Sequence, residues 1–227
     1  MPEPAPNAEL LRSLARLVRG LSALFWGLPL ALIVCFHTAK ADSLRVFNVI
    51  PPLVTTGLLV YALWQLGDFQ KQERVWHTAL DRARVLSLIN FGLSPFLFWW
   101  NRVPYNLFFL IMVTLLCGSG LLFLGSINLV LRRLGAMLPD EALRIETRQF
   151  TALNLNLIVM DLLLGIGYLA ALQARVVPLW LGTALNLLEH GSLWVLVGLV
   201  LLPLAMTMAL LWKTKEVILD SVFGRSH

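Results

Sequence analysis

Charged side chains are scarce in this chain of 227 residues. They make up 14% of the sequence, whereas hydrophobic side chains make up 58%. Soluble globular domains carry roughly 25% charged residues, so this composition excludes an ordinary soluble domain. Because the apolar residues also fall in runs of membrane-crossing length, the sequence predicts an all-α, polytopic integral membrane protein.

Cysteine is nearly absent, and the sequence carries no signature of cofactor binding. Cys35 and Cys117 both lie inside apolar runs, and their spacing fits no metal motif. His37, Glu189 and His190 have no fixed ligand spacing, so we interpret them as solvated loop residues rather than as metal ligands. We therefore expect no cofactor and no resident metal.

Basic residues give the chain a net charge of +5, and most of them lie between the apolar runs. This distribution is typical of membrane topology and does not indicate a nucleic-acid partner. Of the 18 Lys and Arg residues, fourteen fall on the N-terminal side when the segments between six runs are assigned alternately to the two membrane faces. The positive-inside rule then predicts six spans with both termini in the cytoplasm.

The expected spans cover residues 20–36, 49–67, 85–100, 105–131, 150–172 and 192–212. The third span is short and is interrupted by Pro95, so it either crosses with a kink or re-enters. We expect the charged segments 68–84 and 132–148 to be cytoplasmic connections, the first of them helical. The predicted organisation is a disordered start and basic amphipathic helix over 1–19, a six-span domain over 20–212, and a cytoplasmic helix and tail over 213–227.

The amphipathic helix near the N-terminus has leucines on one side and Arg12, Arg16 and Arg19 on the other. This pattern is typical of a helix that anchors at anionic lipid headgroups. Further on, residues 39–41 imitate a signal-peptidase site. The apolar run before them is longer than a usual signal-peptide core, so we expect residues 1–41 to be retained.

One acidic residue, Asp161, lies near the middle of the fifth run. An ionised aspartate at the centre of a bilayer costs roughly 2.5–3.5 kcal/mol on insertion scales, so this side chain should face protein or a wet cavity. Helical spacing puts Asn154, Ile158, Asp161 and Gly165 on one face. We predict that a protonated Asp161 bonds to Ser119 or to a carbonyl freed by a proline. The predicted mid-membrane polar cluster comprises Asp161, Ser119, Asn154, Gly118, Gly120 and Pro203.

Two short motifs resemble the catalytic pair of rhomboid intramembrane proteases. Cys117-Gly118-Ser119-Gly120 resembles their Gly-x-Ser-Gly motif, and Glu189-His190-Gly191 resembles the segment around their histidine. The resemblance implies that Ser119 attacks a peptide carbonyl and that His190 takes its proton. It covers about eight residues, Cys117 replaces the first glycine, and the two side chains lie at different membrane depths. The sequence favours the alternative, a packing seam of small residues that continues through Gly125 and Ser126.

Neutral polar groups are common inside the apolar runs. They include the amides of Asn90, Asn128, Asn154, Asn156 and Asn186. Such groups hold membrane helices together, and no complete catalytic constellation accompanies them. We therefore expect a non-enzymatic membrane subunit or scaffold that packs with other membrane proteins or with itself. The alternative is a small, proton-coupled transporter or transporter component that uses Asp161.

Overall fold

The computed structural model describes residues 8–40, 47–67, 69, 73–137, 141–173 and 200–220. Within these ranges 93% of the residues are helical and no strand is present. The all-α prediction is therefore confirmed. The helices are α1 (Ala8–Lys40), α2 (Ile50–Leu66), α3 (Arg74–Leu93), α4 (Phe96–Arg102), α5 (Leu107–Met137), α6 (Glu141–Gln173) and a further helix over 200–220.

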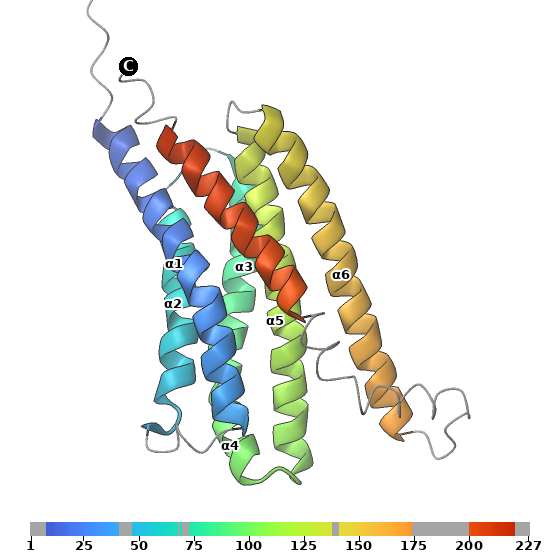
Figure 1. Cartoon of the computed structure of the whole chain (residues 1–227). Coiled ribbons are helices and arrows are strands. Elements are labelled where there is room, and N and C mark those ends of the chain that lie inside the picture. Colours follow the sequence, from blue (N-terminus) through green and yellow to red (C-terminus); the bar gives the residue numbers. More distant parts are fainter. Residues whose placement is uncertain are drawn as a thin grey trace, which may run out of the picture.

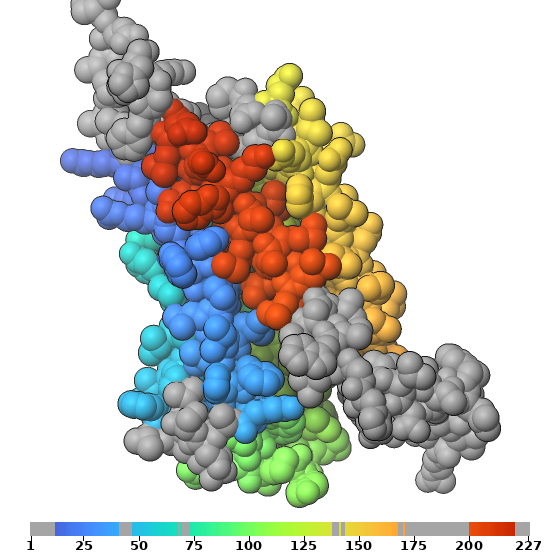
Figure 2. All heavy atoms as spheres, in the orientation of Figure 1, coloured from blue at the N-terminus to red at the C-terminus, as the bar shows by residue number. Residues whose placement is uncertain are grey.

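The long helices lie side by side in a bundle (Figure 1). α1 begins and α5 ends at one end of the bundle, and α6 begins there too, whereas the short α4 lies at the other end. We call the first of these the basic end, because Arg74 begins α3 there, Arg132 and Arg133 lie near the end of α5, and Arg144 lies near the start of α6. In the space-filling view the helix over 200–220 lies between α1 and α6 (Figure 2).

Three helices of the described residues are long and apolar enough to cross a membrane. They are Arg12–Lys40 of α1, Leu107–Met137, which is α5, and Arg144–Gly167 of α6. α2 is also apolar but has 17 residues. The expected third span is divided at Pro95, as its sequence indicates, because α3 ends at Leu93 and α4 begins at Phe96. Of the expected sixth span, residues 192–199 lie outside the described residues.

The charged segments between the apolar runs are largely helical. Helix was expected within 68–84 and after Trp212, and the structure has it there: 74–84 begins α3, and the helix over 200–220 continues past Trp212. The boundaries around the segment 132–148 are corrected, because Arg132 and Arg133 belong to α5 and 141–148 begins α6. Arginine, lysine and glutamate are good helix formers, and the bilayer limits the length of the apolar stretch, not the length of the helix.

The N-terminal amphipathic segment also differs from expectation, because it is continuous with the first apolar run in α1. Its apolar side is buried in the bundle: Leu17 is 0% exposed and Leu21 is 1% exposed. Arg12 and Arg19 stay exposed on the opposite side. The leucines thus pack against protein and not against lipid, whereas the arginines keep the accessibility that contact with headgroups requires.

Two glycines allow α1 and α2 to approach closely. A Cβ atom added at Gly20 would lie 2.9 Å from the backbone oxygen of Ala62, and one at Gly27 would lie 2.9 Å from Leu59 Cδ2. These glycines are seven residues apart and therefore lie on the same side of α1. Small residues at such positions let membrane helices pack backbone against backbone.

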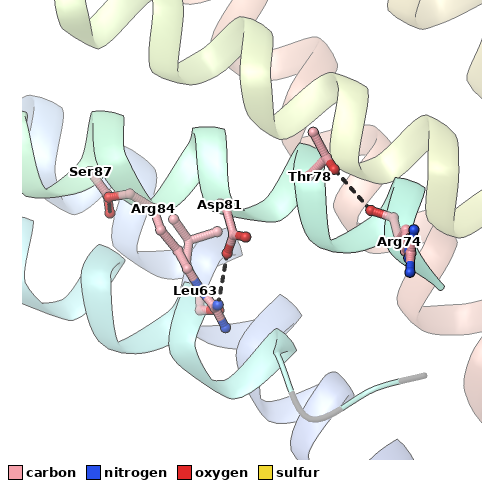
Figure 3. A network of polar contacts seen from close by, with 6 residues as sticks. All are labelled: Leu63, Arg74, Thr78, Asp81, Arg84 and Ser87. Atoms are coloured by element: carbon pink, nitrogen blue, oxygen red, sulfur yellow. Dashed lines mark hydrogen bonds and ion pairs between the residues drawn. The ribbon is translucent and has the colours of Figure 1, made fainter. Parts of the chain in front are cut away.

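Arg84 of α3 holds the end of α2. Its Nε and Nη2 atoms each lie 3.4 Å from the carbonyl oxygen of Leu63, and its Nη1 donates to Asp81 Oδ1 at 3.2 Å (Figure 3). The guanidinium also lies 5.6 Å from the centre of the Trp64 ring. A Cβ atom at Gly67 would lie 1.9 Å from Nη2, so a glycine is needed for this contact.

Replacing Gly20 by alanine should destabilise the bundle, because the backbone of α2 cannot move away from the added carbon at low cost. We expect a loss of about 1–2 kcal/mol, after allowing for the higher helix propensity of alanine. The matched control is Gly120→Ala in α5, where a Cβ atom would meet nothing within 4 Å. The control should be neutral or slightly stabilising. Unfolding midpoints in mild detergent provide the measurement, and equal midpoints for the two variants would contradict this packing.

Candidate functional site

Buried polar side chains join α5, α6 and the helix over 200–220. Asn128, Thr151, Asn154 and Thr207 are each 0% exposed. The hydroxyl of Thr207 is at the centre of the group. It accepts hydrogen bonds from Asn128 Nδ2 at 2.8 Å and from Asn154 Nδ2 at 3.0 Å, and it donates to the carbonyl oxygen of Pro203 at 2.7 Å. One hydroxyl therefore links three helices.

The remaining donors of this cluster are also used. Asn128 Nδ2 donates to the Leu124 carbonyl at 2.8 Å, and Asn154 Nδ2 donates to the Pro203 carbonyl at 3.1 Å. Thr151 Oγ1 donates to the Asn128 carbonyl at 3.3 Å. Both amide oxygens, however, are buried and have no hydrogen-bond partner among the described residues. Leaving a polar group unpaired in an apolar medium costs free energy. The hydrogen bonds that these donors make should therefore determine how the three helices dock.

The carbonyl of Pro203 connects the helix over 200–220 to α6. Its carbonyl oxygen accepts from Thr207, one turn further along, and from Asn154 on the neighbouring helix. Of the predicted mid-membrane residues, Asn154 and Pro203 are thus brought together directly. The carbonyl that the proline ring would leave free belongs to residue 199, which lies outside the described residues.

Ser119 belongs to a different contact, between α3 and α5. Its Oγ donates to Asn90 Oδ1 at 2.5 Å and also lies 3.1 Å from the Leu116 carbonyl. An amide oxygen cannot act as the base that a serine nucleophile needs. His190, the base implied by the rhomboid resemblance, lies outside the described residues. Asn90 was noted in the sequence as a helix-packing amide, but its pairing with Ser119 was not anticipated.

Asp161 is half-buried on the face of α6 that also carries Asn154 and Ile158. Its two carboxyl oxygens are screened from solvent, and neither has a hydrogen-bond partner among the described residues. The predicted bond to Ser119 is therefore not formed, because that hydroxyl is directed to α3 instead. The protein-facing side of α6 includes Asn154 and the 2% exposed Ile158, but it ends before Gly165, which is exposed.

The seam of small residues on α5 begins later than predicted. A Cβ atom at Gly118 or Gly120 would meet nothing within 4 Å, so these residues do not pack against another helix of the described part of the chain. At Gly125 a Cβ atom would lie 3.3 Å from Leu155 of α6, and Ser126 is 7% exposed. The reason is the course of α6, which lies close to α5 near the basic end and leans away from it further along (Figure 1).

These contacts consist of amides, hydroxyls and carbonyls that dock helices, and among the described residues no titratable base bonds to the hydroxyl of Ser119 or Thr207. No group of three or more His, Cys, Asp or Glu residues that could hold a metal is found within the described part of the chain. Cys35 and Cys117 are free thiols. No protein-family model, curated protein or solved structure matches this chain. The interpretation of the site therefore depends on its geometry.

Replacing Thr207 by valine should weaken the docking of α6, because it removes the acceptor shared by two buried amides while preserving the side-chain shape. We expect a loss of about 1–3 kcal/mol in the free energy of unfolding in detergent. Thr114→Val is the control, since the Thr114 hydroxyl bonds only to Leu110 of its own helix, at 2.9 Å. The control should stay within about 0.5 kcal/mol of the wild type. If both variants behave alike, Thr207 does not have the role described above.

Proposed function

We propose that this protein is a non-enzymatic membrane subunit or scaffold that packs against a transmembrane helix of another membrane protein. The proposed contact surface is the outer face of α6, which we define as Leu153, Asn156, Met160, Leu163 and Gly167. All five residues are exposed, and Leu163 is 64% exposed. Their spacing of three and four residues is the pattern by which one helix packs along another.

Asn156 is the observation that supports this proposal most strongly. It is exposed, and its amide has no hydrogen-bond partner among the described residues. It lies about 12 Å along the helix axis beyond Arg148, the last basic residue before the apolar run. A polar amide that faces lipid tails is unfavourable, whereas an amide bonded across two membrane helices contributes about 0.6–2 kcal/mol. A partner helix would give the Asn156 amide a hydrogen-bond partner in place of lipid.

Topology is part of the same proposal: the chain crosses the membrane six times, and both termini are cytoplasmic. The support is the distribution of fourteen of 18 Lys and Arg residues onto one side. The start of α1 and the end of the helix over 200–220 also lie at the basic end of the bundle (Figure 1). In this arrangement the exposed Arg12 and Arg19 lie at the level of anionic headgroups.

A second candidate function is proton-coupled transport through Asp161. One specific observation favours it: both carboxyl oxygens are screened from solvent without a hydrogen-bond partner among the described residues. Intramembrane carboxyl groups of this kind occur in proton pathways. They also occur as packing elements, so the two candidate functions need separate experiments.

Two variants test the outer face of α6. Leu163→Trp adds bulk and should disrupt packing against a partner helix, and Asn156→Leu should remove the amide that bonds to the partner helix. Ile33→Trp is the matched control, because Ile33 is 56% exposed on the outer side of α1. We expect at least about a fivefold loss of proteins that co-purify in mild detergent for the α6 variants and no loss for the control. The measurement is quantitative mass spectrometry of the tagged full-length chain.

Two results would contradict the proposal in different ways. If the wild-type chain purifies without any stoichiometric membrane partner, the subunit role fails. If two differently tagged copies of this chain co-purify through the outer face of α6, the partner is a second copy and the proposed heterologous contact is wrong.

Asp161→Asn separates the second candidate from the first. The substitution keeps the shape of the side chain and removes its titratable carboxyl group. If Asp161 only supports packing, the variant should keep its expression level, its partners and any cellular phenotype. A pH-dependent flux in reconstituted vesicles that is present in the wild type and lost in the variant would instead establish transport.

A further inference from the structure

A pocket of about 380 Å³ lies between α3 and α5 near the basic end. Its walls carry four arginines: Arg74 and Arg82 from α3, and Arg132 and Arg133 from α5. The nine described residues that line it include no aspartate or glutamate. Four positive charges around one small cavity repel each other, and an anion between them would relieve that repulsion.

Helix geometry explains why these arginines converge. Arg74, Thr78 and Arg82 are one turn apart along α3, so they share a face, and that face packs against α5. On α5 the corresponding wall is formed around Ser126 and Arg133. Ser126 is buried, and its hydroxyl donates to the Phe123 carbonyl at 2.7 Å. The pocket therefore has a packed floor and a charged rim.

Two of the acidic side chains near this end pair with residues outside the pocket. Asp81 lies on the side of α3 that faces α2, where it pairs with Arg84 (Figure 3). Glu146 of α6 pairs with Lys213. No ion pair joins any of the four pocket arginines to an acidic group within the residues that the structure describes. Their charges therefore remain available to a ligand.

A second, apolar groove lies between the same two helices, about one turn further from the basic end. It has a volume of about 630 Å³ and is lined by Leu86, Ile89 and Leu93 of α3 and by Leu115, Gly118 and Leu122 of α5, among others. Leu86 is one turn beyond Arg82, and Leu122 is one turn before Ser126. Gly92 and Gly118 keep the groove open, because a Cβ atom at either would meet nothing within 4 Å.

We propose that this seam is a binding site for an anionic phospholipid. The phosphate-bearing headgroup would lie among the four arginines, whose planar guanidinium groups suit phosphate oxygens, and an acyl chain would lie along the apolar groove. The apolar groove is the reason to infer a lipid and not a soluble anion, because a free phosphate has no apolar part that would bind there. The site does not involve α6, so it does not depend on the proposed partner surface.

The test uses the purified full-length chain in mild detergent and measures binding of phosphatidylglycerol, of phosphatidylcholine with the same acyl chains, and of inorganic phosphate. We expect phosphatidylglycerol to bind at least about tenfold more tightly than the other two. The double variant Arg82→Gln/Arg133→Gln should lose at least about tenfold in affinity for phosphatidylglycerol. The control Arg144→Gln/Arg148→Gln makes the same change in charge at exposed positions of α6 and should retain the affinity.

Gly118→Leu provides an independent test of the groove. The added side chain would fill open space, so the fold should be retained while phosphatidylglycerol binding falls by at least about tenfold. Equal binding of phosphatidylglycerol by the wild type and the pocket double variant would overturn the proposal. Inorganic phosphate that binds as tightly as the lipid would overturn the lipid assignment, and unchanged lipid binding by Gly118→Leu would overturn the role of the groove.

Discussion

The hydroxyl of Thr207 is the contact on which the placement of α6 depends. Among the labelled helices, α6 packs mainly against α5, so its position is less constrained than that of α2 or α3. Thr207 accepts hydrogen bonds from an amide of α5 and an amide of α6, and thereby attaches both helices to the helix over 200–220. In an apolar surrounding these bonds have no competition from water, so they determine the register in which the three helices meet.

α6 is attached to its neighbours near the basic end and leans away from α5 further along (Figure 1). Most residues of 159–167 are exposed, whereas Asp161 stays half-buried. Asn156 on the outer side and Asp161 on the inner side have no hydrogen-bond partners among the described residues. The outer face of α6, to which we assign partner binding, lies on the side away from the buried Asn154 and Ile158.

α5 uses different stretches to contact α6 and α3. Gly125 approaches Leu155 of α6 and the Asn128 carbonyl accepts from Thr151 of α6, whereas Ser119 bonds to α3 beside the open groove. Small residues on one helix thus have two roles, close packing in one stretch and open space in another. The sequence pattern alone does not distinguish these roles, because the distinction depends on how far the neighbouring helix is from α5.

Much of the fold could be predicted from apolar runs, including the helical class and the break at Pro95. The helix ends within 132–148 were not predicted, because hydropathy marks where lipid ends, not where a helix ends. Asn154 and Pro203 were identified by residue type, but their pairing could not be, since 49 residues separate them and register between distant helices is set by packing. Thr207 was missed, although its position one turn after a buried proline was a usable signal. Ser119 was predicted to bond to Asp161 because both lie near mid-depth. Depth alone does not determine which sides of their helices face each other.

The docking of α6 through one shared hydroxyl is tested most directly by a double-mutant cycle on Asn154 and Thr207, with unfolding free energies measured in detergent. If the two side chains act as described, the effects of Asn154→Leu and Thr207→Val will not add. Their coupling energy should be about 0.6–1.7 kcal/mol. Strictly additive effects would show that the two residues stabilise the bundle independently and would contradict the account.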